Sequence, residues 1–521
     1  MSWGLEILGN LSISLIGLAN NVSLHGYEGL FTPMSLSSWR VTPDNPVRYR
    51  NSLDVERCAA LHNEILWHGW NASGGKAEDF PGVNWFEFHG NAAQDARARL
   101  SSPLAAFLDQ ALTINGTRHS FFYHVEDLKS PAVLWENHEE FQDPGERDRF
   151  LTLYDGHSLA SHPDGLVYDQ VNHKAIMQTS IFDSDVTQNG RQTWLSLEEI
   201  LTAWLDMIDA GKVQAVTEDI HPTNAKFDPW VLLPYSPKQL NDTLTAFNRL
   251  ADAIESRMPD LQDGSESQQQ VAAGDLDRFL LSHDDLAAAD IPGGFAHSFL
   301  TKARRPKFRY IAPGLSLPTP DSIKSQPFSS VKGHNVPTTD WDDDPGFPER
   351  IYPILIFSSA KKYETWRDPI PNPDFVANHP PFHWPYSQLD SFSAGLYFSS
   401  IRRGYSYEFE DAVKLIVPYP IGGFGYARTA DGARFGENRA EEGLEGFVVG
   451  GGTFSDLFQL GYNPFGEMHD VQLEKVLNAW RELVESGEWT IGKDGVEESI
   501  QKWMDADTAR KWSKYTVPMG W

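Results

Sequence analysis

Three segments of the chain place apolar residues at the three- and four-residue spacing of an amphipathic helix. Two of them start with a capping box, in which Ser196 is followed by Glu199 and Ser236 by Gln239. The third follows Asp470, which we expect to act as its N-cap. The pattern predicts helices over residues 197–210, 237–258 and 471–484.

Shorter apolar stretches bounded by turn-forming residues are typical of strands. They occupy residues 121–128, 175–182, 213–217, 230–234, 308–312, 351–358, 396–400 and 414–418. Long helices mixed with irregularly spaced short strands indicate an α+β fold, and the missing βαβ rhythm argues against a doubly wound sheet or a TIM barrel. We expect a large single domain or two closely packed domains.

A polar stretch without hydrophobic periodicity divides the chain. Residues 259–275 (PDLQDGSESQQQVAAGD) have the composition of a flexible linker or an exposed surface segment. We therefore expect an N-terminal α+β domain over residues 1–258, a polar linker and helix over residues 259–300, and a C-terminal α+β domain over residues 301–521.

The composition limits the partners and the compartment. The 521-residue chain has a formal net charge of −29, so general nucleic-acid binding is not expected. It has no run of 18 apolar residues, and its N-terminal stretch lacks the basic region of a signal peptide. Cys58 is the only cysteine, which excludes an intramolecular disulfide and a cysteine-based zinc or iron–sulfur site. We expect a soluble cytoplasmic protein that does not associate with membranes.

Aromatic residues make up 12% of the chain and include 17 Trp. Large rings supply core volume, and they also suit a concave pocket for a flat or apolar ligand. Trp384 ends a Pro-rich aromatic stretch, His379-Pro-Pro-Phe-His383-Trp384. We expect this stretch to form a loop at the mouth of a pocket, with Trp384 as a substrate-binding residue.

The candidate for catalysis is the segment His119-Ser-Phe-Phe-Tyr-His124-Val-Glu126. Residues two apart on a strand point to the same face, so His124 and Glu126 are expected to lie about 7 Å apart along it. Such a pair can act as a general acid and base toward a bound molecule. In the structural alternative, the histidine and the carboxylate pair with each other or with an arginine.

The same pair can also supply two ligands of a metal site. His173 follows 47 residues after Glu126, and Arg191 comes later. This order resembles the His-x-Asp/Glu…His…Arg order of 2-oxoglutarate-dependent iron oxygenases. The resemblance implies non-haem iron as a cofactor, held by His124, Glu126 and His173. The chain departs from that family because it lacks the many short strands of a jelly roll and because its arginine comes late.

One segment reverses the acidic character of the chain. Residues 302–309 (KARRPKFR) carry five basic side chains in eight positions. Lys302, Arg304 and Arg305 can bind a phosphate, a carboxylate or an RNA backbone. Alternatively, the strip pairs with the acidic linker just before it.

Three classes of function follow from these features. The preferred class is an enzyme that acts on a small apolar or aromatic organic substrate by acid–base chemistry at His124 and Glu126, with metal-assisted oxygenation as a variant. The second is a transferase or synthase that holds a phosphate, CoA or tRNA-borne substrate through residues 302–309. The third is a non-catalytic binding or scaffold protein. Nucleotide-binding and hydrolase motifs are absent, so no motif selects among these classes.

Overall fold

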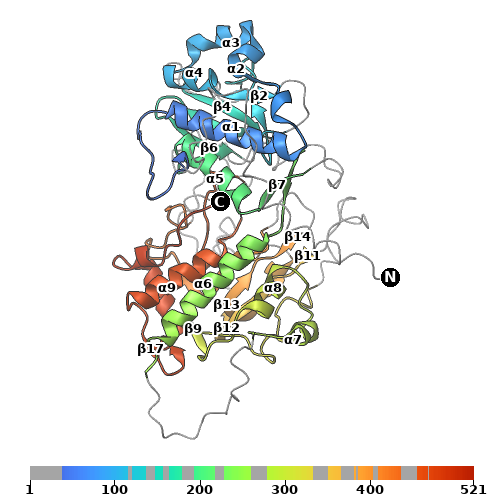
Figure 1. Cartoon of the computed structure of the whole chain (residues 1–521). Coiled ribbons are helices and arrows are strands. Elements are labelled where there is room, and N and C mark those ends of the chain that lie inside the picture. The colour runs from blue at the N-terminus through green and yellow to red at the C-terminus, as the bar shows by residue number, and fades with distance from the viewer. Residues whose placement is uncertain are drawn as a thin grey trace, which may run out of the picture.

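The computed structural model describes residues 38–114, 120–136, 147–156, 164–178, 193–216, 228–259, 279–331, 350–364, 381–382, 385–402, 409–435, 454–466 and 469–521. Within these residues, helices and strands follow one another irregularly and the strands form several separate sheets, which confirms the α+β prediction. Figure 1 shows two bodies, here called the N-terminal half (residues 38–232) and the C-terminal half (residues 235–521). No helix in the described part is long and apolar enough to cross a membrane.

The N-terminal half is built around an antiparallel sheet with the strand order β3-β4-β5-β6. Helices α1 and α5 pack against each other beside this sheet. The elements are α1 Val55–Ala72, η2 Ala77–Asp79, β1 Gly82–Asn84, α2 Trp85–His89, α3 Asn91–Ala96, η3 Arg97–Arg99, α4 Ser102–Leu108, β2 Leu112–Ile114, β3 Val125–Leu128, β4 Phe150–Gly156, β5 Gly165–Asp169, β6 Lys174–Gln178, α5 Leu197–Asp209, β7 Val213–Ala215 and β8 Trp230–Leu232.

A buried arginine attaches the first described residues to α1. The side chain of Asp54 caps this helix by accepting a hydrogen bond from the backbone N–H of Arg57. The guanidinium of Arg57 is fully buried, and a buried cation of this kind needs acceptors for its donors. It donates to the backbone carbonyls of Trp39, Arg40, Asn45 and Pro46. Residues 39–46 are therefore held against the helix.

The C-terminal half contains an eight-stranded sheet with the order β16-β15-β13-β12-β10-β9-β18-β17. All neighbouring strands in it are antiparallel except β18 and β9, which are parallel. The elements are α6 Pro237–Glu255, α7 His283–Ala288, α8 Phe295–Lys302, β9 Tyr310–Ala312, β10 Leu315–Ser316, β11 Arg350–Ile351, β12 Ile354–Glu364, η7 Tyr386–Gln388, β13 Ser391–Phe398, β14 Ile401–Arg402, β15 Val413–Ile421, β16 Phe454–Asp456, α9 Leu473–Glu485, β17 Ile491–Gly492, β18 Gly495–Val496, η8 Ile500–Asp507 and η9 Trp512–Lys514.

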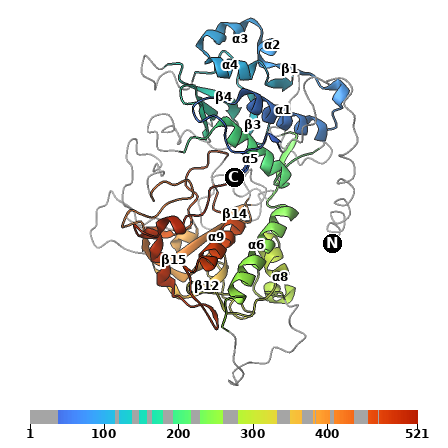
Figure 2. The same cartoon turned by 60° about the vertical axis from the view of Figure 1, so that its left-hand side comes forward.

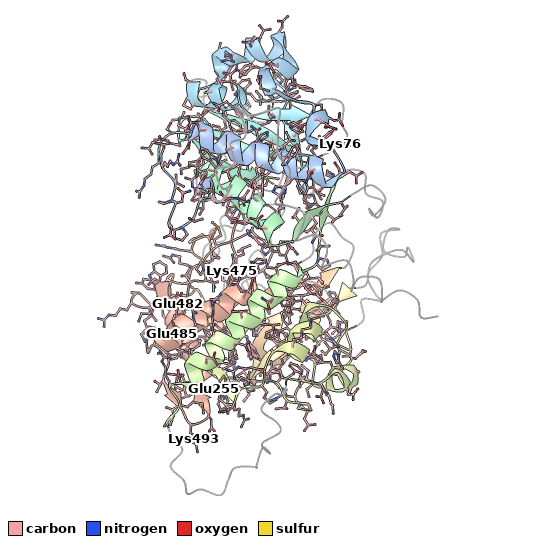
Figure 3. All side chains as sticks on the ribbon, in the orientation of Figure 1. Lys76, Glu255, Lys475, Glu482, Glu485 and Lys493 are labelled. Atoms are coloured by element: carbon pink, nitrogen blue, oxygen red, sulfur yellow. The ribbon has the colours of Figure 1, made fainter. Side chains whose placement is uncertain are left out.

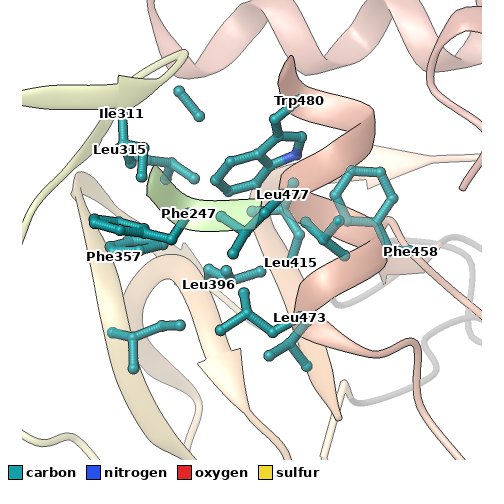
Figure 4. Packing of buried hydrophobic residues seen from close by; sticks show 14 of the residues in the cluster. Phe247, Ile311, Leu315, Phe357, Leu396, Leu415, Phe458, Leu473, Leu477 and Trp480 are labelled. Carbon is teal, nitrogen blue, oxygen red and sulfur yellow. The ribbon is translucent and has the colours of Figure 1, made fainter. Parts of the chain in front are cut away.

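Helices α6 and α9 lie side by side on this sheet, with their apolar faces turned to it (Figure 1 and Figure 4). Trp480 and Leu477 of α9 and Phe247 of α6 are fully buried in the core between them. Phe357 of β12 meets Trp480 with ring centroids 6.3 Å apart. The helical spacing in the sequence therefore identified the inward faces of both helices.

The two halves have separate cores that share a boundary. Phe409, Ala412 and Phe465 belong by sequence to the C-terminal half, but they pack in the N-terminal core. The indole N–H of Trp204 on α5 donates to the carbonyl of Phe465 at 2.6 Å. Helix α6 packs in the C-terminal core. The predicted division into domains at residues 258 and 301 stays a prediction.

The predicted N-cap of α9 is wrong. Asp470 accepts a hydrogen bond from the Ser399 hydroxyl at 2.6 Å and pairs with Lys414 at 2.9 Å. The Asp470 carboxylate therefore binds a hydroxyl and an ammonium from other parts of the chain and does not cap the helix. The helix begins two residues later than expected, with Gln472 in the N-cap position.

Candidate functional site

His124 and Glu126 do not share one face of a strand, as the sequence suggested. Phe122 and Val125 exchange backbone hydrogen bonds of 3.1 and 3.0 Å, which close a two-residue turn at Tyr123 and His124. His124 adopts a φ of +65° in this turn, and β3 starts only at Val125. The side chain of His124 is buried while that of Glu126 is exposed. The alternation of side chains fails because the turn interrupts the strand, and the catalytic role of the pair stays a prediction.

His173 lies in the turn between β5 and β6, with a φ of +54°. Its Nδ1 is 3.0 Å from the Tyr168 hydroxyl, and partial burial lowers its pKa. His124, Glu126 and His173 all lie in the described part of the chain, where no three His, Cys, Asp or Glu side chains group closely enough to hold a metal ion. The proposed iron ligands therefore do not meet in this fold. Arg191 lies outside the described residues.

Two of the five basic side chains of the strip, Arg304 and Arg305, are engaged within the protein. Arg304 pairs with Glu255 at 3.2 Å and with Asp252 at 2.5 Å, both near the end of α6. Arg305 donates to backbone carbonyls, including that of Pro318 at 3.1 Å. Lys302 is exposed. These partners of Arg304 lie on α6, before the linker, and residues 260–275 of the linker lie outside the described residues, so the pairing of the strip with the linker stays a prediction.

A cleft opens where the two halves meet, with a cavity volume of about 300 Å³. We call it the central cleft, and it lies between the end of α5, the first turns of α6 and α9, and the last residues of the chain. The C-terminus lies between the two halves in both views (Figure 1 and Figure 2). The charged lining consists of Asp206, Asp209, Lys238, Asp242, Asp411, Glu474 and Lys475. Trp521 adds an aromatic side chain to the wall.

Local sequence fixes the helix ends that form this cleft. Helix α5 ends at Ala210, and Gly211 turns the chain with a φ of +68° that favours glycine. The Ser236 hydroxyl donates to the carbonyl of Ala210, which attaches the start of α6 to the end of α5. Ser236 and Gln239 then form the capping box of α6. Side chains in the last turn of α5 and the first turn of α6 therefore face one another across the cleft.

Most charged groups at the rim have partners within the protein. Arg40 pairs with Asp206 at 3.3 Å and with Asp209 at 3.1 Å. Lys238 pairs with Asp242 at 2.6 Å. One guanidinium therefore pairs with two carboxylates, and the rim keeps a net negative charge.

Asp411 differs from the rim residues because it is only 2% exposed. Its Oδ2 accepts hydrogen bonds from the side-chain amides of Gln239 and Gln472, each at 3.0 Å. Its Oδ1 is buried and has no hydrogen-bond partner. Burial raises the pKa of this carboxyl, and the charge of nearby Lys212 opposes the rise.

Lys475 is the second charged side chain of the cleft that has a polar group without a partner. Its ammonium group makes no hydrogen bond or ion pair with any described residue. Burial lowers its pKa, and the charges of Glu474 and Asp411 oppose the decrease. A Cβ placed on Gly520 would collide with Lys475 Nζ, so the C-terminal segment lies directly against the ammonium.

These two groups give the cleft its chemical capacity. A carboxyl with a raised pKa and an amine with a lowered pKa are suited to transferring a proton. The Asp411 oxygen without a hydrogen-bond donor and the Lys475 ammonium without an acceptor are also suited to ligand groups of opposite charge.

The sequence analysis missed Asp411 and Lys475. They belong to no motif, and the partners of Asp411 come from two helices that are far apart in the chain. The only local signals were the helix start near residue 472 and the strand that follows residue 412. Trp384, the predicted residue at a pocket mouth, lies outside the described residues.

Comparisons with known proteins give no assignment. No protein-family model matches the chain, and no curated protein or solved structure matches it. The function is therefore argued from the central cleft alone.

Proposed function

We propose that the protein binds a small molecule in the central cleft, through a cationic or hydrogen-bond-donating group that contacts Asp411. The observation that carries this proposal is the buried Oδ1 of Asp411, which lacks a hydrogen-bond partner in a residue that lines the cavity. A buried acceptor left unpaired costs about 1–3 kcal/mol. A ligand that donates to this oxygen recovers that free energy, so the site favours such a ligand.

Charge and size narrow the choice of ligand. Five carboxylates and two lysines line the cleft, and the chain as a whole has a net charge of −29. The resulting negative potential attracts cations. Because one water occupies about 30 Å³ of liquid, a cavity of about 300 Å³ holds a molecule of on the order of ten non-hydrogen atoms. The charged lining favours a polar ligand over the apolar or aromatic substrate predicted from the sequence.

Acid–base chemistry on a small molecule was the class of activity favoured by the sequence. Within the present proposal, Asp411 and Lys475 are the groups that would perform it, in place of His124 and Glu126. Their pKa values are displaced in opposite directions by burial, which supports roles as proton donor and proton acceptor.

Calorimetric titration of the purified full chain tests the binding proposal. The probes are n-butylamine and 4-aminobutanoate, both of which present an ammonium group. We expect Asp411→Asn to weaken binding of every probe that binds by at least about tenfold, which corresponds to about 1.4 kcal/mol. Glu482→Gln is the matched control because Glu482 lies exposed on α9. The proposal fails if neither probe binds, or if the affinity is unchanged in Asp411→Asn.

A further inference from the structure

Two side chains of opposite charge in the central cleft have polar atoms without a hydrogen-bond or ion-pair partner in the described part of the chain. Asp411 presents a carboxylate oxygen that accepts no hydrogen bond. Lys475 presents an ammonium that pairs with nothing in the described part of the chain. The other ionised groups around the cavity are already engaged: Asp206 and Asp209 with Arg40, and Asp242 with Lys238. Lys475 therefore still lacks an anion, and Oδ1 of Asp411 still lacks a hydrogen-bond donor.

Glu474, the remaining carboxylate of the lining, does not supply the missing anion. It accepts a hydrogen bond from Asn478 at 2.9 Å, one turn along the same helix. Lys475 Nζ is instead held beside Gly520, where any larger side chain would displace it. Figure 3 places Lys475 at the end of α9 that faces the N-terminal half, away from the exposed Glu482 and Glu485 farther along the helix.

The positions of the two groups are fixed by the same short region of chain. The backbone N–H of Leu473, the first residue of α9, donates to the carbonyl of Asp411 at 2.9 Å. Gln472 binds the Asp411 carboxylate, and Lys475 follows three residues later in the first turn of the helix. Asp411 and Lys475 therefore line the same cavity of about 300 Å³.

We infer that the ligand of the central cleft is a zwitterion of the amino-acid class, with its ammonium group at Asp411 and its carboxylate at Lys475. This inference rests on the proposed function and specifies its ligand. A simple amine satisfies Asp411 but leaves Lys475 unpaired, and a simple carboxylate does the reverse. A zwitterion satisfies both groups, and it adds no net charge to the cavity.

The closing experiment compares probes of equal chain length on the full protein by calorimetry. The zwitterions are glycine, 4-aminobutanoate and 6-aminohexanoate, which differ in the distance between their charges. Each is paired with the amine and the carboxylate of the same length, such as n-butylamine and butanoate for 4-aminobutanoate. We expect at least one zwitterion to bind ten times or more as tightly as both of its single-charge counterparts.

Variants assign each end of the ligand. Lys475→Met should reduce the affinity for the zwitterion to that of the amine, and Lys475→Gln provides a second variant should the first unfold. Asp411→Asn should weaken binding of both compounds. Lys493→Gln is the control for loss of a lysine, because Lys493 is exposed in the turn between β17 and β18.

The outcomes separate this inference from the proposed function. If every amine binds as tightly as its zwitterion and requires Asp411, the zwitterion inference is overturned and the binding site stands. If Lys475→Met leaves the affinity for the zwitterion unchanged, Lys475 does not hold the carboxylate of the ligand and the inference is likewise overturned. If no probe binds, both fail.

Discussion

Gln472, the N-cap residue of α9, donates its side-chain amide to Oδ2 of Asp411 at 3.0 Å. Gln239, from the first turn of α6, donates to the same oxygen. One buried carboxylate thus joins the starts of two helices through a single oxygen atom. The second oxygen is not needed for this contact, which separates the structural role of Asp411 from its proposed role in binding.

We expect Asp411→Asn to keep the fold and to increase thermal stability at neutral pH. The amide oxygen of Asn can accept both glutamine donors, and the variant avoids burying a charge. Since burial raises the pKa of Asp411 above its usual 3.8, this carboxyl contributes stability below that value, and the contribution is lost as the pH rises through the folded pKa. The difference in melting temperature between variant and wild type should therefore grow as the pH increases from 4 to 7. A variant that is less stable at every pH, when Glu482→Gln is not, would contradict this account.

Protonation of His62 is expected to contribute to acid unfolding. Its Nδ1 lies 2.7 Å from the Tyr154 hydroxyl and its Nε2 lies 2.7 Å from the Leu112 carbonyl. Burial lowers its pKa from 6.5 to about 4, so the unfolded chain binds the proton first as the pH falls. Stability present above pH 6.5 is then lost as the pH falls through about 4, by about 3 kcal/mol in total.

The measurement for His62 is urea unfolding at pH 7 and at pH 5. His62→Gln should be less stable than wild type at pH 7 but should lose less stability between the two pH values. His68→Gln, a half-buried position on the same helix, is the control for loss of a histidine. An unchanged pH dependence in His62→Gln would rule out this contribution.

Trp480 offers a test of the packing between α9 and the sheet. Its ring is fully buried and lies 6.3 Å from Phe357 and 5.7 Å from Trp503 between centroids. Trp480→Ala should cost about 3–5 kcal/mol in the free energy of unfolding. The indole N–H has no hydrogen-bond partner, so Trp480→Phe removes a buried unpaired donor and should cost less than about 2 kcal/mol. Chemical denaturation measures the free energy of unfolding of both variants. Equal losses in Trp480→Ala and Trp480→Phe would contradict the expected cost of the unpaired indole N–H.

Asp507 is expected to order the loop that follows β15. Its carboxylate accepts hydrogen bonds of 2.8–3.0 Å from the backbone N–H groups of Gly422, Phe424, Tyr426 and Ala427. Because a hydrogen bond to a charged group contributes about 1.5–3 kcal/mol, Asp507→Ala should lose at least about 3 kcal/mol. Asp507→Asn keeps one acceptor oxygen and should lose about half as much. In both variants we expect faster amide hydrogen exchange confined to residues 422–427. Unchanged protection of these amides would show that Asp507 does not order the loop.

The sequence predicted those helix starts that depend on hydrogen bonds between residues close together in the chain. The capping boxes at Ser196 and Ser236 close within three residues, and both helices begin where these boxes placed them. Asp470 failed as a cap because Lys414, which lies 56 residues earlier in the chain, binds its carboxylate. His124 failed as a strand residue because the turn at that position is formed by backbone hydrogen bonds that hydrophobicity does not reveal.

Sequence patterns could not predict the candidate site either, because it also depends on residues far apart in the chain. Whether a buried carboxylate keeps an unpaired oxygen depends on how many donors the fold brings to it. Asp411 receives two donors, from residues 172 positions before it and 61 positions after it. No spacing rule connects such residues, so the sequence analysis chose His124 and Glu126 instead.

The shared boundary between the two cores has a consequence for dissecting the protein. Phe409, Ala412 and Phe465 complete the N-terminal core, and Met519 and Trp521 pack against it. A fragment ending at residue 232 would expose the apolar surface that these side chains cover, and the complementary fragment would carry them unprotected in water. Each piece alone would therefore tend to aggregate, and mixing the two could restore a native complex.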